Sequence, residues 1–226
     1  QAKPAAPPPN FDAYVASVMK QFEVPGMGIA IVKDGQVVLA KGYGVKRLGS
    51  SDKVDADTRF GIASNTKAFT ALALGMLVEE GKLEWDAPVV NYLPQFMMWD
   101  SWVTRQITVR DILVHNSGLG LGAGDLLWWP PTTYTPSEIM RRLRYIEPAT
   151  SFRSAYAYDN VLYLVAGQLI QAVSGQSWSD FVTNRIIRPV GMKEATTTHA
   201  AAGDAQGNVA ATHARVDGVV RVIKPF

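Results

Sequence analysis

The stretch Phe60-Gly-Ile-Ala-Ser-Asn-Thr-Lys67, followed by Ala68-Phe-Thr-Ala-Leu-Ala-Leu-Gly-Met-Leu-Val78, is the most informative part of the 226-residue sequence. Residues 68–78 leave almost no polar face on a helical projection, which predicts a buried helix. Ser64 and Lys67 are three positions apart, so they lie on one face of its first turn. The sequence therefore predicts a hydroxyl and an amine side by side where a buried helix begins.

The Ser-x-x-Lys spacing alone is weak evidence for a catalytic pair, because the chain contains three such pairs: Ser17–Lys20, Ser50–Lys53 and Ser64–Lys67. The first pair lies in an amphipathic helical pattern, where a polar face explains it. The second lies in a Gly/Ser/Asp-rich loop that is expected to be solvated. Only the third follows an apolar stretch and precedes a buried helix, so it is the candidate for chemistry.

The plain alternative is that Ser64 caps the helix and Lys67 lies on the surface. A capping box would have Glu or Gln where Lys67 stands, and the helix dipole favours acids in the first turn. Desolvation and the dipole both disfavour the ammonium form, so we expect an amine of Lys67 that can accept the proton of Ser64. The backbone N–H of Ser64 is also available to an oxyanion.

The composition excludes several functions. Lys and Arg number 22 against 20 Asp and Glu, without a long basic run, which argues against nucleic acid as a partner. No apolar stretch approaches the length of a membrane span. The absence of cysteine removes disulfides, thiolate metal sites and a cysteine nucleophile. The three histidines show no metal-ligand spacing, so we expect no metal and no cofactor.

Three stretches come near to other functional motifs, but each departs from its motif at positions that the function requires. Residues 75–83 have one residue too many between the glycines of a P-loop, and Leu83 replaces Ser or Thr. Residues 118–123 fit a dinucleotide fingerprint, but residues 125–131 behind them, with two Trp and two Pro, cannot form its helix. Residues 175–179 lack the last glycine of a nucleophile elbow. Nucleotide binding and a Ser-His-Asp hydrolase are therefore disfavoured.

Periodicity predicts an amphipathic helix over 11–22 and two strands, 27–32 and 36–40, joined by a tight turn at Asp34-Gly35. Further predicted elements are helices over 108–114, 137–145, 161–173 and 180–187, and a second hairpin of strands 213–216 and 219–223 around Asp217-Gly218. The order indicates an α+β fold, in which helices flank an antiparallel sheet and a large helical insert spans about 61–200.

Residues 1–10 are rich in Ala and Pro and begin with Gln1, so we expect a tether ahead of a domain over 11–226. Such a segment is common just after a cleaved leader, which suggests an exported protein, periplasmic or secreted.

Four stretches also carry a resemblance to a known family. They are Phe60-Gly-Ile-Ala-Ser-Asn-Thr-Lys67, Ile107-Thr-Val-Arg-Asp-Ile-Leu-Val-His-Asn-Ser-Gly-Leu119, Tyr158-Asp-Asn160 and Arg188-Pro-Val-Gly-Met192. They resemble the S-x-x-K, LLxHxSGL, Y-x-N and PLGM motifs of the serine β-lactamase and penicillin-binding-protein superfamily. The likeness is greatest to class C β-lactamases, D-alanyl-D-alanine carboxypeptidases and related esterases. Order and spacing agree from about residue 11 to the C-terminus.

The resemblance implies a role for each matched residue. Ser64 would be the acylated nucleophile and Lys67 its activator, while Tyr158 would carry the proton between Ser64 and the leaving group. Asn160 would hold Lys67 and a substrate carbonyl. The alternative for Tyr158 and Asn160 is a helix N-terminus with the Asn side chain on the backbone. The resemblance assigns His115 and Ser117, in the second motif, to loop shaping more readily than to catalysis.

The family's third motif, Lys-Thr-Gly or His-x-Gly on a strand beside the nucleophile, is absent from this sequence. Lys224-Pro225 cannot replace it, because proline lacks the backbone N–H that such a strand provides. We therefore expect a β-lactamase-like fold without its C-terminal strands, completed by the remainder of the same protein or by a second chain.

The function implied is that of a serine hydrolase acting through an acyl-Ser64 intermediate on a small ester, amide or β-lactam substrate. A cluster of large apolar residues is expected mainly in the core, and it would favour apolar acyl groups if it lined a cleft. The cluster comprises Met97, Met98, Trp99, Trp102, Trp128 and Trp129. The alternative is a non-catalytic sensor that binds penicillin or peptidoglycan-like ligands without turnover.

Overall fold

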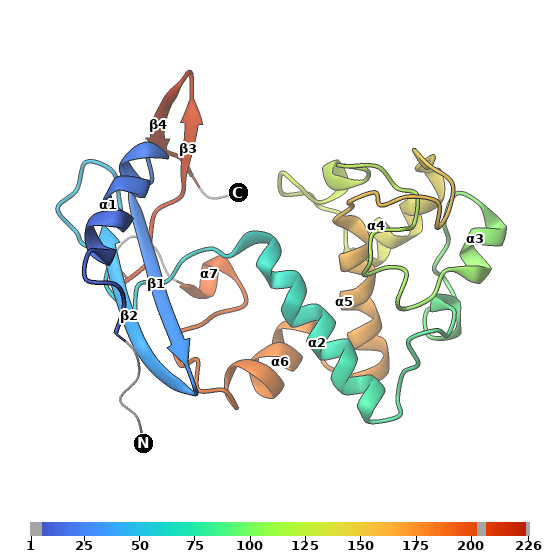
Figure 1. The fold of residues 1–226 in the computed structure, drawn as a ribbon. Coiled ribbons are helices and arrows are strands. Elements are labelled where there is room, and N and C mark those ends of the chain that lie inside the picture. Colours follow the sequence, from blue (N-terminus) through green and yellow to red (C-terminus); the bar gives the residue numbers. More distant parts are fainter. Residues whose placement is uncertain (1–5, 203–206, 225–226) are drawn as a thin grey trace. The chain divides into compact units, whose positions relative to one another are not determined.

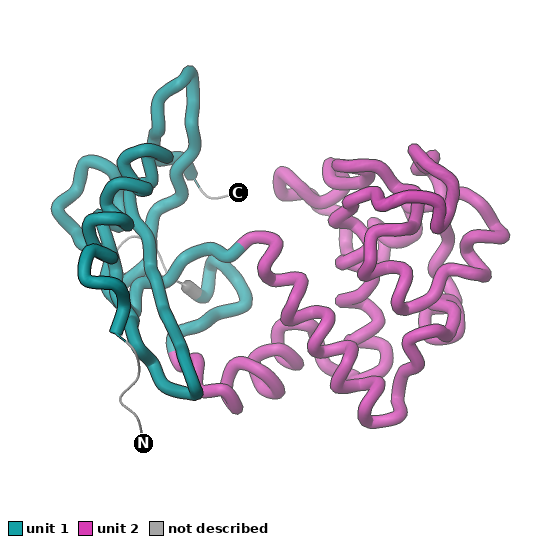
Figure 2. Tube along the Cα trace, in the orientation of Figure 1, with its two compact units in different colours: residues 1–62, 194–225 teal, residues 63–193, 226 magenta. Residues whose placement is uncertain are grey.

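The computed structural model describes residues 6–202 and 207–224. The chain divides into two compact units, which are shown in different colours in Figure 2. The first combines residues 1–62 with 194–225, and the second is essentially the continuous segment 63–193. Both units mix helices with strands or turns, and the strands belong to the first unit (Figure 1).

The first unit begins with helix α1 (Phe11–Gln21), followed by an antiparallel hairpin of β1 (Gly26–Lys33) and β2 (Gln36–Gly44). The turn residues Asp34 and Gly35 have φ angles of 51° and 72°, which are the positive values that a tight hairpin turn requires. The predicted helix and hairpin are therefore confirmed, with the strands slightly longer than expected.

The second half of this unit contains α7 (His199–Ala202) and a hairpin of β3 (His213–Val216) and β4 (Val219–Val222). The predicted far hairpin is thus confirmed. A short parallel bridge joins Arg59 to this region, where Arg59 donates to the carbonyl of Asn208 over 2.8 Å. Among the described residues the strands form two separate two-stranded antiparallel sheets.

The second unit is built on two long helices, α2 (Thr66–Glu79) and α5 (Val161–Ser174), which lie side by side (Figure 1). The shorter α6 (Trp178–Val182) continues into a π-helical turn, η5 (Thr183–Ile187), and packs against both. The core between them is formed by apolar side chains with almost no exposed surface: Leu74, Leu77, Leu162, Leu169, Ile170 and Phe181. These contacts hold α2 and α5 against each other.

Shorter elements surround this core. They are η1 (Ala63–Asn65), η2 (Val89–Asn91), α3 (Ser101–Gln106), η3 (Asp125–Leu127), α4 (Pro136–Arg142) and η4 (Leu143–Tyr145). Thr135 and Glu138 form a capping box at α4, which begins one residue before the predicted start at 137. Gly175 ends α5 with a φ of 73°, so the helix reaches one residue beyond the predicted end at 173.

Three expectations about this unit are wrong. Residues 109–115 form turns, not a helix, although Thr108 and Asp111 make the reciprocal bonds of a capping box. The bond from Ile112 to Thr108 is followed by a tighter one from Leu113 to Arg110, and the chain leaves helical geometry at His115, whose φ is 60°. Helix α2 is buried on one side only, and Leu72 is 51% exposed. Trp99 and Trp102, expected mainly in the core, are each more than half exposed.

None of the helices in the described ranges combines the length and apolarity needed to cross a lipid bilayer. Within the same ranges, His, Asp and Glu side chains nowhere gather in threes in a way that could hold a metal ion.

Candidate active site

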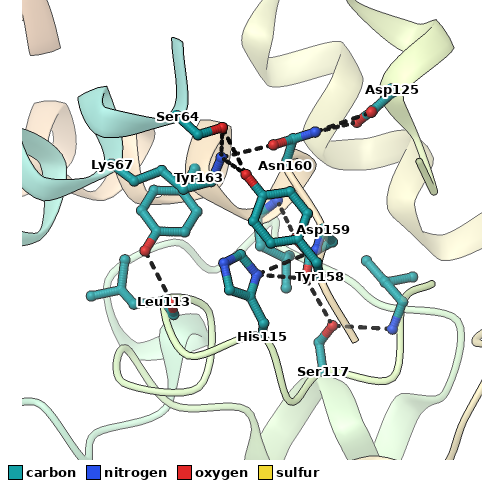
Figure 3. A network of polar contacts seen from close by, with 12 residues as sticks. Ser64, Lys67, Leu113, His115, Ser117, Asp125, Tyr158, Asp159, Asn160 and Tyr163 are labelled. Atoms are coloured by element: carbon teal, nitrogen blue, oxygen red, sulfur yellow. Dashed lines mark hydrogen bonds and ion pairs between the residues drawn. The ribbon is translucent and has the colours of Figure 1, made fainter. Parts of the chain in front are cut away.

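Ser64 lies in η1, the 3₁₀ turn that leads directly into α2. The residue before it, Ala63, has a φ of 43°, a left-handed conformation that is uncommon for a residue with a side chain. Asn65, not Ser64, occupies the N-cap position, and no side-chain capping bond is formed there. Capping thus does not explain Ser64, whose hydroxyl instead faces polar groups of the same unit (Figure 3).

Lys67 lies in the first turn of α2, and its ammonium group contacts three oxygen atoms. Nζ donates to Ser64 Oγ over 3.1 Å, to the Tyr158 hydroxyl over 2.7 Å and to Asn160 Oδ1 over 2.7 Å. A lysine ammonium has three N–H donors, so each one is matched by an acceptor. The group also lies over the ring of Tyr163, 5.1 Å from its centroid.

Tyr158 brings its hydroxyl to the same point from the segment before α5. Its oxygen lies 2.7 Å from Ser64 Oγ, and either group can donate in that hydrogen bond. The hydrogen bonds from Lys67 and then from Ser64 lower the pKa of Tyr158, because both stabilise a negative charge on its oxygen. The phenolate of Tyr158 is therefore easier to form here than in a free tyrosine.

Asn160 is the N-cap residue of α5, but its side chain makes no capping bond. Its carbonyl oxygen faces Lys67, and its amide nitrogen donates to the two carboxylate oxygens of Asp125, over 3.4 Å and 3.0 Å. The alternative in which Asn160 points at the backbone is therefore wrong. Asp125 was not among the residues selected from sequence, since no motif or spacing marks it.

His115 supports Tyr158 from below in Figure 3. Its ring lies against that of Tyr158 with 4.4 Å between centroids, and its Nδ1 accepts the backbone N–H of Asp159 over 3.3 Å. Burial, followed by the charge of Lys67, lowers the pKa of His115, so the neutral imidazole is favoured. His115 thus packs on the ring of Tyr158, whose hydroxyl is hydrogen-bonded to Ser64.

Asp159 is fully buried beneath this group. Its carboxylate accepts the backbone N–H of Leu162 over 3.1 Å and the hydroxyl of Ser117 over 3.3 Å. Burial raises the pKa of Asp159 from 3.8 to about 6. Ser117 and Asp159 therefore join the loop of the second motif to the first turn of α5.

The family is shown by comparison of the whole sequence. The sequence matches the profile of the family described as Beta-lactamase over residues 11–224. The chain belongs to the β-lactamase family. The resemblance noted from the four motifs is thereby confirmed, as is the β-lactamase-like fold.

This β-lactamase-family chain has relatives that are named as hydrolases. It is 34% identical over 192 residues to an unguisins hydrolase, ungD', of Aspergillus campestris, a match that covers 81% of this chain and 35% of the relative. The chain thus spans about a third of the length of that curated relative.

Two solved structures have the same fold. The octameric penicillin-binding protein homologue from Pyrococcus abyssi is 28% identical with a TM-score of 0.76, over 95% of this chain and 50% of its own. The D-amino acid amidase from Ochrobactrum anthropi SV3 is 26% identical with a TM-score of 0.72, over 92% of this chain and 58% of its own. The chain therefore has a β-lactamase-family hydrolase fold.

Within this fold, the residues selected from sequence come from two separate places. Ser64 comes from η1 and Lys67 from the first turn of α2, and the segment that leads into α5 supplies Tyr158 and Asn160. The structure brings all four into one hydrogen-bonded group. It adds three residues of the same unit as immediate neighbours: His115, Asp125 and Asp159.

Proposed function

We propose that this chain carries the nucleophile and proton-transfer groups of a serine hydrolase that forms an acyl-Ser64 intermediate. One observation carries the proposal: Ser64 Oγ lies 2.7 Å from the Tyr158 oxygen while Lys67 donates hydrogen bonds to both. This is the arrangement that a hydroxyl nucleophile and an adjacent base require. The hydrolase relatives support the same reaction class.

In the first step, the Tyr158 phenolate accepts the proton of Ser64 as Oγ attacks the carbonyl carbon of the substrate. The charge of Lys67 stabilises the phenolate before transfer and favours the polarised hydroxyl during it. Tyr158 then gives the proton to the leaving amine or alcohol as the bond to the carbonyl carbon breaks. The products of this half-reaction are the acyl-enzyme and a protonated leaving group.

Hydrolysis of the acyl-enzyme uses the same groups in reverse. A water molecule attacks the acyl carbon and passes its proton to Tyr158, and Ser64 recovers a proton as the ester bond breaks. The acid product leaves and the site returns to its starting state. The backbone N–H of Ser64 is proposed as one donor to the oxyanion in both steps.

The three hydrogen bonds of Lys67 support a different division of labour from the one expected from sequence. The hydrogen bonds from Lys67 and then from Ser64 lower the pKa of Tyr158, and its oxygen lies 2.7 Å from Ser64 Oγ, which supports Tyr158 as the group that accepts the proton. We therefore assign the base to Tyr158. Lys67 becomes the charge that makes Tyr158 an effective base.

The second oxyanion donor is proposed to come from outside this sequence. The third motif of the family is absent from residues 1–226, and proline at 225 excludes Lys224-Pro225 as a replacement. A strand from the remainder of the protein, or from a second chain, would supply that donor.

The substrate proposed is a small acyl compound, such as an ester, a peptide-like amide or a β-lactam. The relatives named above include a hydrolase of unguisins and a D-amino acid amidase, which favours amides among these classes.

Turnover of three substrate types by the full-length protein tests the proposal. A fluorescent penicillin, a p-nitrophenyl ester and a D-aminoacyl p-nitroanilide should each be examined with wild type and Ser64→Ala. Repeated turnover that Ser64→Ala abolishes supports the hydrolase. A stable adduct on Ser64 without release supports the sensor, and turnover that survives Ser64→Ala refutes the assignment of the nucleophile.

A further inference from the structure

Asp125 is the acidic residue closest to the candidate site in the hydrogen-bond network. It begins η3, and both of its carboxylate oxygens accept from the amide nitrogen of Asn160, at 3.0 Å and 3.4 Å (Figure 3). Asn160 in turn accepts from Lys67. A carboxylate, an amide and an ammonium thus form one chain of hydrogen bonds that ends at Ser64.

The backbone holds Asp125 in this place. Gly124 precedes it with a φ of 79°, and a Cβ atom at Gly124 would lie 3.2 Å from the side chain of Val161, the first residue of α5. The N–H of Asp125 donates to Gly122 over 3.0 Å. The loop therefore packs closely on the start of α5, next to Asn160.

The orientation of the Asn160 amide decides whether Lys67 has its third acceptor. One end of an amide group accepts hydrogen bonds and the other donates them. If the Asn160 amide were rotated by 180°, its NH₂ group would face the Lys67 ammonium. Both groups only donate, so no hydrogen bond could form between them. An ionised carboxylate only accepts, so Asp125 can pair with the NH₂ end alone.

The geometry points to Asp125 as a positioning residue that fixes the Asn160 amide and, through it, directs Lys67 toward Ser64 and Tyr158. The inference rests on the proposed function and adds a residue that no motif of the family resemblance identified. Asp125 touches neither Ser64 nor Tyr158 by a hydrogen bond, so its effect is transmitted by Asn160.

The charge of Asp125 has a second, opposite effect. Lys67 and Ser64 lower the pKa of Tyr158, while the negative charge of Asp125 works to raise it. Removal of the charge should therefore let Tyr158 ionise at lower pH, whereas removal of the acceptor should misdirect Lys67. Two substitutions separate these effects, because Asp125→Asn keeps an acceptor oxygen and Asp125→Leu removes it.

The first experiment measures labelling of Ser64 by a fluorophosphonate probe between pH 5 and 10 in the full-length protein. Asp125→Leu should reduce the plateau rate about tenfold. Asp125→Asn should recover most of that loss and shift the midpoint of the pH profile down by roughly 0.5 unit. Glu147→Gln removes an exposed carboxylate of the same unit and should leave rate and midpoint unchanged.

The second experiment needs no activity. Exchange of the Asn160 side-chain amide protons is followed by ¹H–¹⁵N NMR, with Asn160→Asp used to assign the signal. Exchange should be slow in wild type and Asp125→Asn and about tenfold faster in Asp125→Leu, since the protecting acceptor is lost.

The outcomes separate the two proposals. If wild type labels at Ser64 but Asp125→Leu labels equally fast with the same pH profile, the role of Asp125 is wrong and the proposed function stands. If wild type does not label, the proposed function fails. Whatever the labelling result, equal exchange of the Asn160 amide protons in wild type and Asp125→Leu would show that Asp125 does not hold the Asn160 amide.

Discussion

At the scale of single residues, the candidate site depends on how Lys67 shares its three N–H groups. The distances from Nζ to its three partners, the oxygens of Ser64, Tyr158 and Asn160, are 2.7 to 3.1 Å. Arginine keeps the positive charge but presents a planar fork of donors, so it cannot reproduce this geometry.

Lys67→Arg should therefore reduce labelling of Ser64 by a fluorophosphonate about 100-fold or more, without unfolding the protein. Labelling rate and circular dichroism measure the two parts of this expectation. Lys82→Arg, at a salt bridge with Glu80, is the matched control and should label normally. If Lys67→Arg labels Ser64 as fast as wild type does, the reaction does not depend on the three hydrogen bonds of the Lys67 ammonium.

Tyr158 contributes a ring that packs on His115 and a hydroxyl that contacts Ser64, and one substitution separates the two. Tyr158→Phe keeps the ring that lies against His115 but removes the oxygen 2.7 Å from Ser64. Labelling should fall about 100-fold to 10,000-fold, as expected for loss of a general base, while the melting temperature changes little. Tyr145→Phe, at an exposed tyrosine, provides the comparison. Labelling within twofold of wild type would argue that another group is the base.

Sequence reasoning selected some residues of this network and missed others for identifiable reasons. Lys67 was conspicuous because a cation in the first turn of a helix breaks a local rule. Tyr158 and Asn160 were selected through the family resemblance. Asp125 and the stacking of His115 depend on contacts across 35 and 43 positions of chain, which no local pattern encodes.

At the scale of elements, the segment just before α5 contains a buried carboxylate, that of Asp159, whose charge opposes folding. Asp159 ionises near pH 4 in an unfolded chain, whereas burial raises its pKa to about 6 in the folded protein. The folded state thus binds more protons between these values. Its free energy of unfolding falls as pH rises from 4 to 6 and is then constant, a loss of about 2 to 3 kcal/mol.

Asp159→Asn should not show this loss, because the Asn side chain can accept from Leu162 and donate to Ser117 without carrying a charge. The variant should gain stability over wild type between pH 4.5 and 7.5. Urea unfolding followed by tryptophan fluorescence measures it, since all six tryptophans lie in the second unit. Asp57→Asn, at an exposed carboxylate, is the control. A difference that does not depend on pH would refute the interpretation.

The loop of the second motif requires glycine at 118. Gly118 has a φ of 93°, and a Cβ atom there would lie 2.4 Å from the carbonyl oxygen of Thr150. Gly118→Ala should therefore lower the free energy of unfolding by about 2 kcal/mol or more. Gly122→Ala is the matched control, because its φ is 80° but no atom lies within 4 Å of the added Cβ. Equal losses in the two variants would show that backbone strain alone is responsible.

Elements with strong local signals were predictable and those governed by side-chain contacts were not. The Asp-Gly turns, the capping box of α4 and the glycine after α5 each act within a few residues. The helix expected over 108–114 has its capping contacts between Thr108 and Asp111, but it does not form, because the backbone turns away at His115 with a φ of 60°. Helix α3 was missed because its Asp100 cap precedes only six helical residues.

At the scale of the whole molecule, the two units differ in how much surface they bury. No residue of β1 or β2 is fully buried, whereas α5 contains six buried residues. An isolated pair of strands is marginally stable in water, while helices packed on a common core are protected.

Backbone hydrogen exchange of the 226-residue chain should therefore be slow in α5 and α2 and at least about tenfold faster in the β1–β2 hairpin. Mass spectrometry of peptides from the two regions measures this difference. The short hairpin of β3 and β4 serves as an internal reference and should exchange as fast as β1–β2. Protection of β1–β2 equal to that of α5 would contradict the prediction.

Ser64, Lys67, Tyr158, Asn160 and Asp125 all belong to one uninterrupted portion of the chain, 63–193. The positions of these five side chains relative to one another are therefore set within this one segment. Insertions, deletions or exchanges in the flanking sequence therefore leave the segment that carries all five residues uninterrupted. A comparison of chains that differ only outside 63–193 would therefore vary the surroundings of one and the same group of side chains.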